Sequence, residues 1–337
     1  MLAPAQGGLD FEHSVATTVP VDPSLARIGR RLAGRVILGT ASWNFPGWRG
    51  LVYGEDADAT RLSREGLESY AVHPLLNGVS IDRSYYAPLS EQAAAAYASQ
   101  TPEHFRFMVK APRDLTTWRG SGGPRAGEEA TAGAPGALLD PEWARDAFLA
   151  PLCAGLGDRL GLVMFQFPPS RTDAFGGAQQ FARLLRGFLE ALPTGPLYGV
   201  EVRNRHWLTP AYVEALTATG AVHCLSVHPA LPDLHTQMKL TAPALRRALV
   251  VRWNLGHGRS YEAARARYAP FNRIVDADPR SRDQIARLCA RAVTAGVPAY
   301  VTVNNKAEGS APLSIELLAR QIEARLPEDA GDQDALD

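Results

Sequence analysis

Residues 197–227 read LYGVEVRNRHWLTPAYVEALTATGAVHCLSV, and their composition changes twice along the way. The runs at 197–203 and 221–227 are apolar and rich in β-branched residues, as buried strands require. Between them, Thr209 suits a helix N-cap, Pro210 the first helical position and Gly220 the end of the helix. This order predicts two parallel strands joined by a helix that covers them.

The same alternation recurs along the whole chain. Apolar runs that suit strands stand at 36–40, 78–82, 105–109, 160–167, 197–203, 221–227, 249–254 and 299–305. Helical patterns lie between them, for example at 90–101, 178–192 and 281–296, where Ser90 and Ser281 are the expected N-caps. Eight strand units favour an α/β fold, a single (β/α)8 TIM-like barrel, over an open doubly wound sheet. No Gly-x-Gly-x-x-Gly motif follows a strand, which further disfavours a dinucleotide-binding fold.

Three segments fall outside the barrel pattern. Residues 1–28 are expected to form a flexible leader, residues 29–326 the barrel domain, and the acidic residues 327–337 a disordered tail. Residues 119–140 are rich in glycine, alanine and proline, and they predict a mobile insertion after the third strand.

The charge balance and the cysteine content of the chain disfavour several classes of protein. Lysine plus arginine and aspartate plus glutamate both total 35, so the formal net charge is zero and no overall field attracts nucleic acid or a membrane. The apolar runs are much shorter than the roughly 20 residues of a membrane helix, and the N-terminus lacks the pattern of a signal peptide. The cysteines, at 153, 224 and 289, are odd in number and far apart, which fits a reducing compartment. We therefore expect a cytoplasmic protein without membrane association.

Charged side chains stand where several predicted strands end. The C-terminal ends of barrel strands build the functional site, whereas charges seldom occupy strand interiors. Guanidinium forks and an ammonium group suit a phosphate or a carboxylate, so Lys110, Arg203 and Arg252 are expected to bind an anionic ligand. Glu201 and Asp82 are the expected general acid or base.

Amide and aromatic side chains stand at the same strand ends. The expected ligand-binding residues of this kind are Gln166, Asn254, Asn304, Asn305, Trp43, Tyr85 and Tyr86. Packing in the core is the alternative interpretation for Trp43 and Tyr86. A simple turn is the alternative for the paired asparagines.

The histidines do not indicate a metal site. They follow strands at 206, 228, 235 and 257, but without His-x-His or His-Glu-x-x-His spacing. The neighbouring arginines would also oppose a cation. Ser226 and His228 share a strand face, yet no Gly-x-Ser-x-Gly motif points to a hydrolase nucleophile. We therefore expect neither a metal nor another cofactor.

Six segments together resemble a known family. They are GTASWNFPGWRGLVY, VSIDRSYYAPLS, FRFMVKAPRDLT, LGLVMFQFPPS, VEVRNRHWLTP and YVTVNNKAEGSAP, in order from Gly39 to Pro312. The chain resembles the YecE-like proteins, domain of unknown function 72. The resemblance implies a TIM-like barrel and no established reaction. The likeness of that barrel to sugar-phosphate isomerases and the endonuclease IV group suggests phosphate or DNA ligands by fold analogy alone.

The chain departs from the family pattern near the expected site. The family usually reads Val-Glu-Ile-Asn in the second strand, where this chain has Ser80 and Asp82. A histidine common after the third strand is replaced near Thr117, and the acid common after the paired asparagines is Lys306. Two candidate acid/base groups are therefore lost, and Asp82 can replace one of them.

Three functions remain open on these grounds. The first is a hydrolase or isomerase that acts on a phosphorylated or otherwise anionic small molecule. The second is a barrel that binds or processes nucleic acid, with Trp43, Tyr85 and Tyr86 stacking on bases. The third is a barrel that has lost catalysis and retains a binding role. For Glu201, Arg203 and Arg252 themselves, the alternative interpretation is an ion network of purely structural value at the barrel mouth. The sequence does not indicate an oligomeric state.

Overall fold

The structure is a computed structural model that describes residues 19, 22–54, 56–118, 137–256, 258 and 260–327. Most of the predicted leader, the greater part of the 119–140 insertion and nearly all of the 327–337 tail lie outside the described residues. His257 lies outside them as well.

Eight parallel strands close into a barrel in chain order, and the last strand pairs with the first. They are β1 (Val36–Thr40), β2 (Gly78–Ile81), β3 (Arg106–Lys110), β4 (Leu160–Phe167), β5 (Tyr198–Val202), β6 (Val222–Val227), β7 (Leu249–Trp253) and β8 (Ala299–Val303). Seven strands lie within the predicted apolar runs, and β3 is shifted by one residue. The prediction of a single (β/α)8 TIM-like barrel is confirmed.

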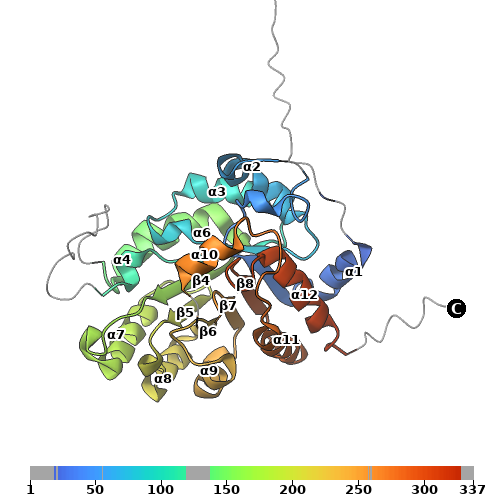
Figure 1. The fold of residues 1–337 in the computed structure, drawn as a ribbon. Helices are drawn as coiled ribbons and strands as arrows, with labels where there is room; N and C mark the ends of the chain where they lie inside the picture. Colours follow the sequence, from blue (N-terminus) through green and yellow to red (C-terminus); the bar gives the residue numbers. More distant parts are fainter. Residues whose placement is uncertain are drawn as a thin grey trace, which may run out of the picture.

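Helices cover the outside of the barrel (Figure 1). They are α1 (Pro23–Leu32), α2 (Ala59–Ala71), α3 (Glu91–Ser99), α4 (Arg113–Thr116), α5 (Pro141–Trp143), α6 (Ala150–Leu156), α7 (Ala178–Glu190), α8 (Pro210–Thr219), α9 (Leu234–Thr241), α10 (Tyr261–Tyr268), α11 (Pro279–Thr294) and α12 (Ala311–Glu323). Short 3₁₀ turns follow several strands, among them η2 (Arg83–Tyr85) after β2. None of the described helices is both long enough and apolar enough to cross a membrane.

Side-chain caps explain where the helices begin. The hydroxyls of Ser90 and Thr209 accept backbone hydrogen bonds at the starts of α3 and α8, as predicted. The prediction that Ser281 caps α11 is wrong, because the helix already begins at Pro279. Asp278 is the cap: its carboxylate accepts from the backbone N–H of Ser281 at 3.0 Å, and Pro279 supplies a φ already suited to the first turn.

Helix α1 begins inside the segment predicted as a leader. Its Leu25, Ile28 and Leu32 are buried, because residues three and four positions apart share one helix face. The helix lies beside α12 (Figure 1), and Arg320 of α12 donates to Asp22 at 3.0 Å. Residues 23–28 therefore pack as part of the barrel domain, in contrast to the predicted boundary at residue 29.

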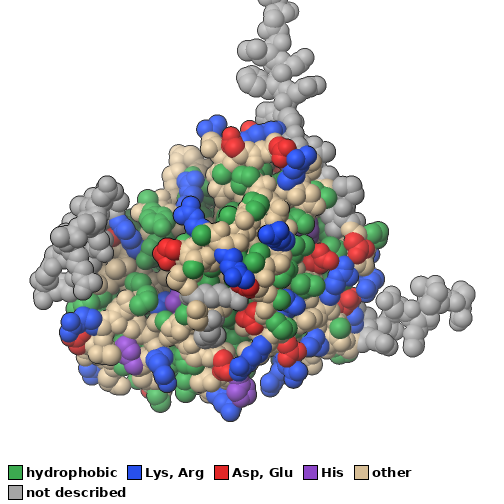
Figure 2. All heavy atoms as spheres, in the orientation of Figure 1, with side chains coloured by type: hydrophobic (Ala, Val, Ile, Leu, Met, Phe, Trp, Pro, Cys, Tyr) green, Lys and Arg blue, Asp and Glu red, His purple; other side chains and the backbone are tan. Residues whose placement is uncertain are grey.

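Alternation along the strands separates an apolar barrel interior from a polar mouth. Ile37, Met108, Leu162, Met164, Val222, Cys224, Ala248 and Val250 form a cluster of their own. Two residues further along, the same side of the strands carries Lys110, Gln166, Ser226 and Arg252, since side chains two apart on a strand point the same way. The C-terminal mouth of the barrel is therefore the place where inward-facing polar groups meet. On the face of the molecule that Figure 2 shows, basic and acidic side chains are interspersed.

Candidate functional site

Glu201 is fully buried between two arginines. Its Oε1 accepts from Arg203 Nε at 2.6 Å, and its Oε2 accepts from Arg252 Nη1 at 2.8 Å. Burial raises the pKa of the Glu201 carboxyl, but the charges of Arg203 and Arg252 lower it more. The net pKa of Glu201 therefore lies well below its usual range, so this side chain stays ionised near neutral pH.

Arg252 joins three other side chains of the barrel mouth. Besides Glu201, its Nη1 donates to Gln166 Oε1 at 3.0 Å, and its Nη2 donates to Asp82 Oδ2 at 3.3 Å. Burial lowers the pKa of this guanidinium, but Glu201 and Asp82 raise it more, so the net shift is upward. Arg252 is only 5% exposed and remains charged, which makes it a link between β2, β4, β5 and β7.

Asp82 is the carboxylate of this group that reaches the pocket. Its side chain is 35% exposed, whereas Glu201 has no exposed surface. The Asp82 Oδ1 accepts from Ser80 Oγ at 2.7 Å, so both carboxylate oxygens have a protein donor. The two positions that depart from the family pattern, Ser80 and Asp82, therefore form one hydrogen-bonded unit.

Lys110 lies at the C-terminal end of β3, where no carboxylate of the described residues pairs with it. Its Nζ is 3.7 Å from the centroid of the Tyr85 ring, and no ion pair joins it to a described acidic residue. The net pKa of Lys110 is lowered to about 8, because burial and the charge of Arg252 lower it more than Asp82 raises it. Lys110 therefore changes its charge close to physiological pH.

These side chains surround a pocket of about 360 Å³. Its lining consists of Asp82, Tyr85, Tyr86, Lys110, Gln166, Arg203, His228, Arg252, Asn254, Leu255, Tyr261 and Asn304. Most of the site residues that were predicted from the C-terminal ends of the strands therefore lie around one pocket. Glu201 is not part of the lining, because it lies below the pocket with both oxygens bonded to arginines.

Two residues predicted to contact a ligand are packed away from the pocket. Trp43 is buried against Tyr97, and its indole N–H donates to the carbonyl of Leu62 at 3.0 Å. Asn305 Oδ1 accepts from Trp48 Nε1 at 3.2 Å and from the backbone N–H of Ala311 at 2.8 Å. Neither side chain lines the pocket, in contrast to the prediction. Trp43 is a core residue, and Asn305 holds the start of α12.

Tyr261 and Leu255 line the pocket but were not predicted from the strand ends, and Tyr261 is the aromatic one. It comes from α10, a helix in the connection between β7 and α11 that the sequence pattern did not predict. The ring is 55% exposed, and the Nζ of Lys306 lies 4.1 Å from its centroid. The capping hydroxyl of Ser260, directly before Tyr261, was the available signal for this helix. Across the pocket, Tyr85 and Tyr86 pack edge to face, and Tyr86 is 69% exposed.

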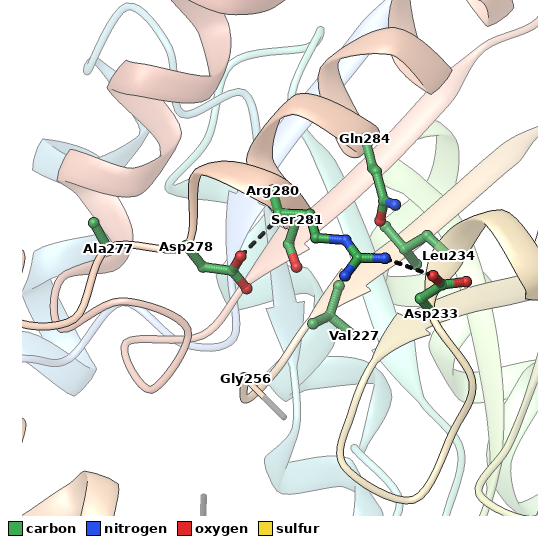
Figure 3. A pocket seen from close by; sticks show the side chains of 9 residues that line it. All are labelled: Val227, Asp233, Leu234, Gly256, Ala277, Asp278, Arg280, Ser281 and Gln284. Atoms are coloured by element: carbon green, nitrogen blue, oxygen red, sulfur yellow. Dashed lines mark hydrogen bonds and ion pairs between the residues drawn. The ribbon is translucent and has the colours of Figure 1, made fainter. Parts of the chain in front are cut away.

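Figure 3 shows a second pocket, of about 310 Å³. Val227 and Gly256 line it, and their chain neighbours His228 and Leu255 line the mouth pocket. Figure 3 shows Arg280 reaching Asp233, with a distance of 3.0 Å between their charged atoms. This pair neutralises the main positive charge of the second pocket. Among the described residues, no group of three His, Cys, Asp or Glu side chains is placed to hold a metal ion.

Comparisons with known proteins agree on one family. The family model "Protein of unknown function DUF72" matches residues 37–334. The UPF0759 protein YunF of Bacillus subtilis (strain 168) is 28% identical over 194 residues, which are 56% of this chain and 61% of that protein. The chain thus aligns with less than two thirds of the length of this relative.

Solved structures show the same fold. A DUF72 family protein from Thermotoga maritima MSB8 superposes with a TM-score of 0.58 at 20% identity, over 86% of this chain and 99% of that one. A DUF72 family protein from Enterococcus faecalis V583 gives a TM-score of 0.56 at 16% identity, over 87% and 97% of the two chains. The resemblance to the YecE-like proteins is confirmed, and the chain belongs to the DUF72 family of proteins of unknown function.

Proposed function

We propose that this protein binds a small organic anion in the mouth pocket and carries out a chemical step on it there. One observation carries the proposal: Arg203, Arg252 and Lys110 gather at the pocket, and the carboxylates beside them offset only part of their charge. Three positive groups against Glu201 and Asp82 leave one positive charge when Lys110 is protonated. An anion entering the pocket would compensate it.

Arg203 and Lys110 are the groups that remain able to bind the anion. Arg203 uses its Nε on Glu201, while its Nη2 makes only a long 3.5 Å contact with Gln166. Arg252, in contrast, already donates to Glu201, Gln166 and Asp82. We therefore assign Arg252 a supporting role, and we assign the contact with the ligand to Arg203 and Lys110.

Acid/base chemistry in this proposal belongs to Asp82 rather than to Glu201. Glu201 is buried, ionised and bonded to two arginines, so it orients them and does not exchange a proton with a ligand. Asp82 lines the pocket and is partly exposed, as a general acid or base must be. Asn254 and Asn304 line the same pocket and offer amides to ligand hydroxyls.

The nucleic-acid alternative has less support. A protein that tracks a nucleic-acid backbone needs a continuous basic surface, because phosphate contacts supply most of its affinity. Figure 2 shows acidic and basic side chains interspersed on the face it presents. Trp43, one of the three rings expected to stack on bases, is buried in the core.

Thermal unfolding with added anions tests the proposal. We expect inorganic phosphate to raise the melting temperature of the wild-type protein more than sodium chloride of equal ionic strength does. Arg203→Gln should weaken phosphate binding roughly tenfold to a hundredfold, because it removes a charge-assisted contact. Arg183→Gln, on the exposed face of α7, is the matched control and should leave the phosphate effect intact. An equal response of the wild type to both salts would overturn the proposal.

A further inference from the structure

The chain contains only three lysines, at positions 110, 239 and 306, among its 35 lysines and arginines. Lys239 is exposed on α9, and Lys306 lies against the ring of Tyr261. Lys110 lines the mouth pocket. The difference matters chemically, since an amine can lose its proton and attack a carbon atom, whereas a guanidinium stays protonated.

Polar and charged groups from several neighbouring elements surround Lys110. Tyr85 from η2 and Gln166 from β4 line the same pocket, and Asp82, Glu201, Arg203 and Arg252 influence its charge. The two carboxylates are already paired with arginines, so they compensate the ammonium form of Lys110 poorly. With the pKa of Lys110 lowered to about 8, about a tenth of the side chain is a neutral amine at pH 7.

We propose that Lys110 is a nucleophile that forms an imine with a small aldehyde or ketone carrying an anionic group. This inference rests on the proposed function, in which Arg203 holds the anion in the same pocket. The reactive amine comes from the end of β3 and the anion-binding arginine from the residue directly after β5, so a short ligand can present its carbonyl to one and its anionic end to the other. A pocket of about 360 Å³ is at the small end of the usual range for small-molecule sites.

The chemical step balances without a further reactant. The lone pair of Lys110 Nζ attacks the carbonyl carbon, the C–N bond forms, and the π electrons of the C=O bond move to oxygen. The oxygen takes up, one after the other, the two protons that the nitrogen gives up and leaves as water, while the nitrogen lone pair forms the C=N bond. Asp82 lines the pocket and is the carboxylate there that can carry a proton between nitrogen and oxygen.

Reductive trapping in the full-length protein tests this inference. The probes are glyceraldehyde 3-phosphate and uncharged glyceraldehyde, each with sodium cyanoborohydride, and peptide mass mapping locates the reduced adduct. We expect the phosphorylated probe to label Lys110 roughly tenfold faster than Lys239 or more, because an ordinary lysine, with a pKa of about 10.4, is almost entirely protonated at pH 7.5. The labelling rate should rise with pH, with a midpoint near the pKa of about 8.

Two variants complete the design. Lys110→Arg keeps a cation beside Tyr85 and should abolish the fast adduct, whereas Lys239→Arg should leave it unchanged. The comparison of Lys110 with Lys239 inside the wild-type chain needs no variant, so it stands even if Lys110→Arg does not fold. Labelling of Lys110 no faster than that of Lys239 overturns the inference.

The two probes separate this inference from the proposed function. Fast labelling by both aldehydes, without protection by inorganic phosphate, supports the nucleophile and counts against the anion site. Preference for the phosphorylated probe, together with protection by phosphate, supports both. Stabilisation of the fold by phosphate without labelling of Lys110 overturns the nucleophile and leaves the anion site standing.

Discussion

Glu201 Oε2 and Arg252 Nη1 are 2.8 Å apart, and the contact joins β5 to β7 across β6. Both side chains are buried, and neither strand is the hydrogen-bonded neighbour of the other. The pair therefore ties together parts of the barrel that the backbone ladder does not connect directly. The pair also holds Arg252 within hydrogen-bond distance of Gln166 and Asp82. A buried ion pair therefore positions side chains that line the pocket.

Replacement of Arg252 by alanine should destabilise the fold. The substitution removes a buried cation and leaves Glu201 with Arg203 alone, so we expect a loss of about 3–5 kcal/mol in the free energy of unfolding. Chemical denaturation measures it. Arg252→Lys should recover only part of the loss, because an ammonium cannot reproduce the planar fork. Arg183→Ala, on the exposed surface, should change stability by about 0.5 kcal/mol or less. An Arg252→Ala protein as stable as the wild type would show that the guanidinium is solvated.

The ionised state of Glu201 should make the fold sensitive to acid. The pKa of this carboxyl is lowered in the folded protein, so its contribution is present above the unfolded pKa of about 4.3 and is lost as the pH falls further. Melting temperatures of the wild type and Glu201→Gln should be measured from pH 7 to pH 3. We expect the wild type to be the more stable of the two at pH 7 and the difference to shrink below about pH 4.3. A constant difference over this range would contradict the assignment.

Lys110 should destabilise the fold as long as its side chain is protonated. Its pKa falls from 10.5 to about 8 on folding, so between these values the unfolded chain binds more protons than the folded one. Stability should therefore rise with pH through this window, because the unfavourable ammonium form disappears. The comparison is with Lys110→Met, which lacks the charge at every pH. Between about pH 8 and pH 10, we expect the free energy of unfolding of the wild type to rise relative to that of Lys110→Met. If the two proteins show the same dependence of stability on pH, the lowered pKa of Lys110 is refuted.

Substitutions of the adjacent residues Asn304 and Asn305 should have different effects, one mainly on phosphate binding and the other mainly on stability. Asn305→Ala leaves the N–H groups of Trp48 and Ala311 without their acceptor, so a loss of about 1–3 kcal/mol in unfolding free energy is expected. Asn304 lines the pocket and accepts one backbone hydrogen bond, from Lys306, so Asn304→Ala should cost less stability and weaken phosphate binding. Denaturation and phosphate titration of both variants check this. Equal effects of the two substitutions would contradict the division of roles.

Much of the pocket can be predicted from the residues at the C-terminal ends of the strands. Period-two alternation places Glu201 and Arg203 on one side of β5, and the eight strand units imply a closed barrel whose ends share one mouth. Lys110, Gln166 and Arg252 are the last inward-facing residues of their strands or lie close to them, so this reasoning found them without knowledge of the distances.

The alternation of side chains along a strand shows on which side of the sheet a residue lies. It does not show which hydrogen-bond or ion-pair partner a polar side chain has, because the partners come from other strands and from loops. The register between strands places Glu201 below the pocket and Asp82 within it. The turn after β8 sends Asn304 into the pocket and Asn305 toward Trp48 and α12. Tyr261 enters from a helix that no strand pattern marks. Local pattern thus established the fold and the side of each strand residue. Long-range packing settled charge pairing, burial and access to the ligand, because these depend on distances between residues far apart in the chain.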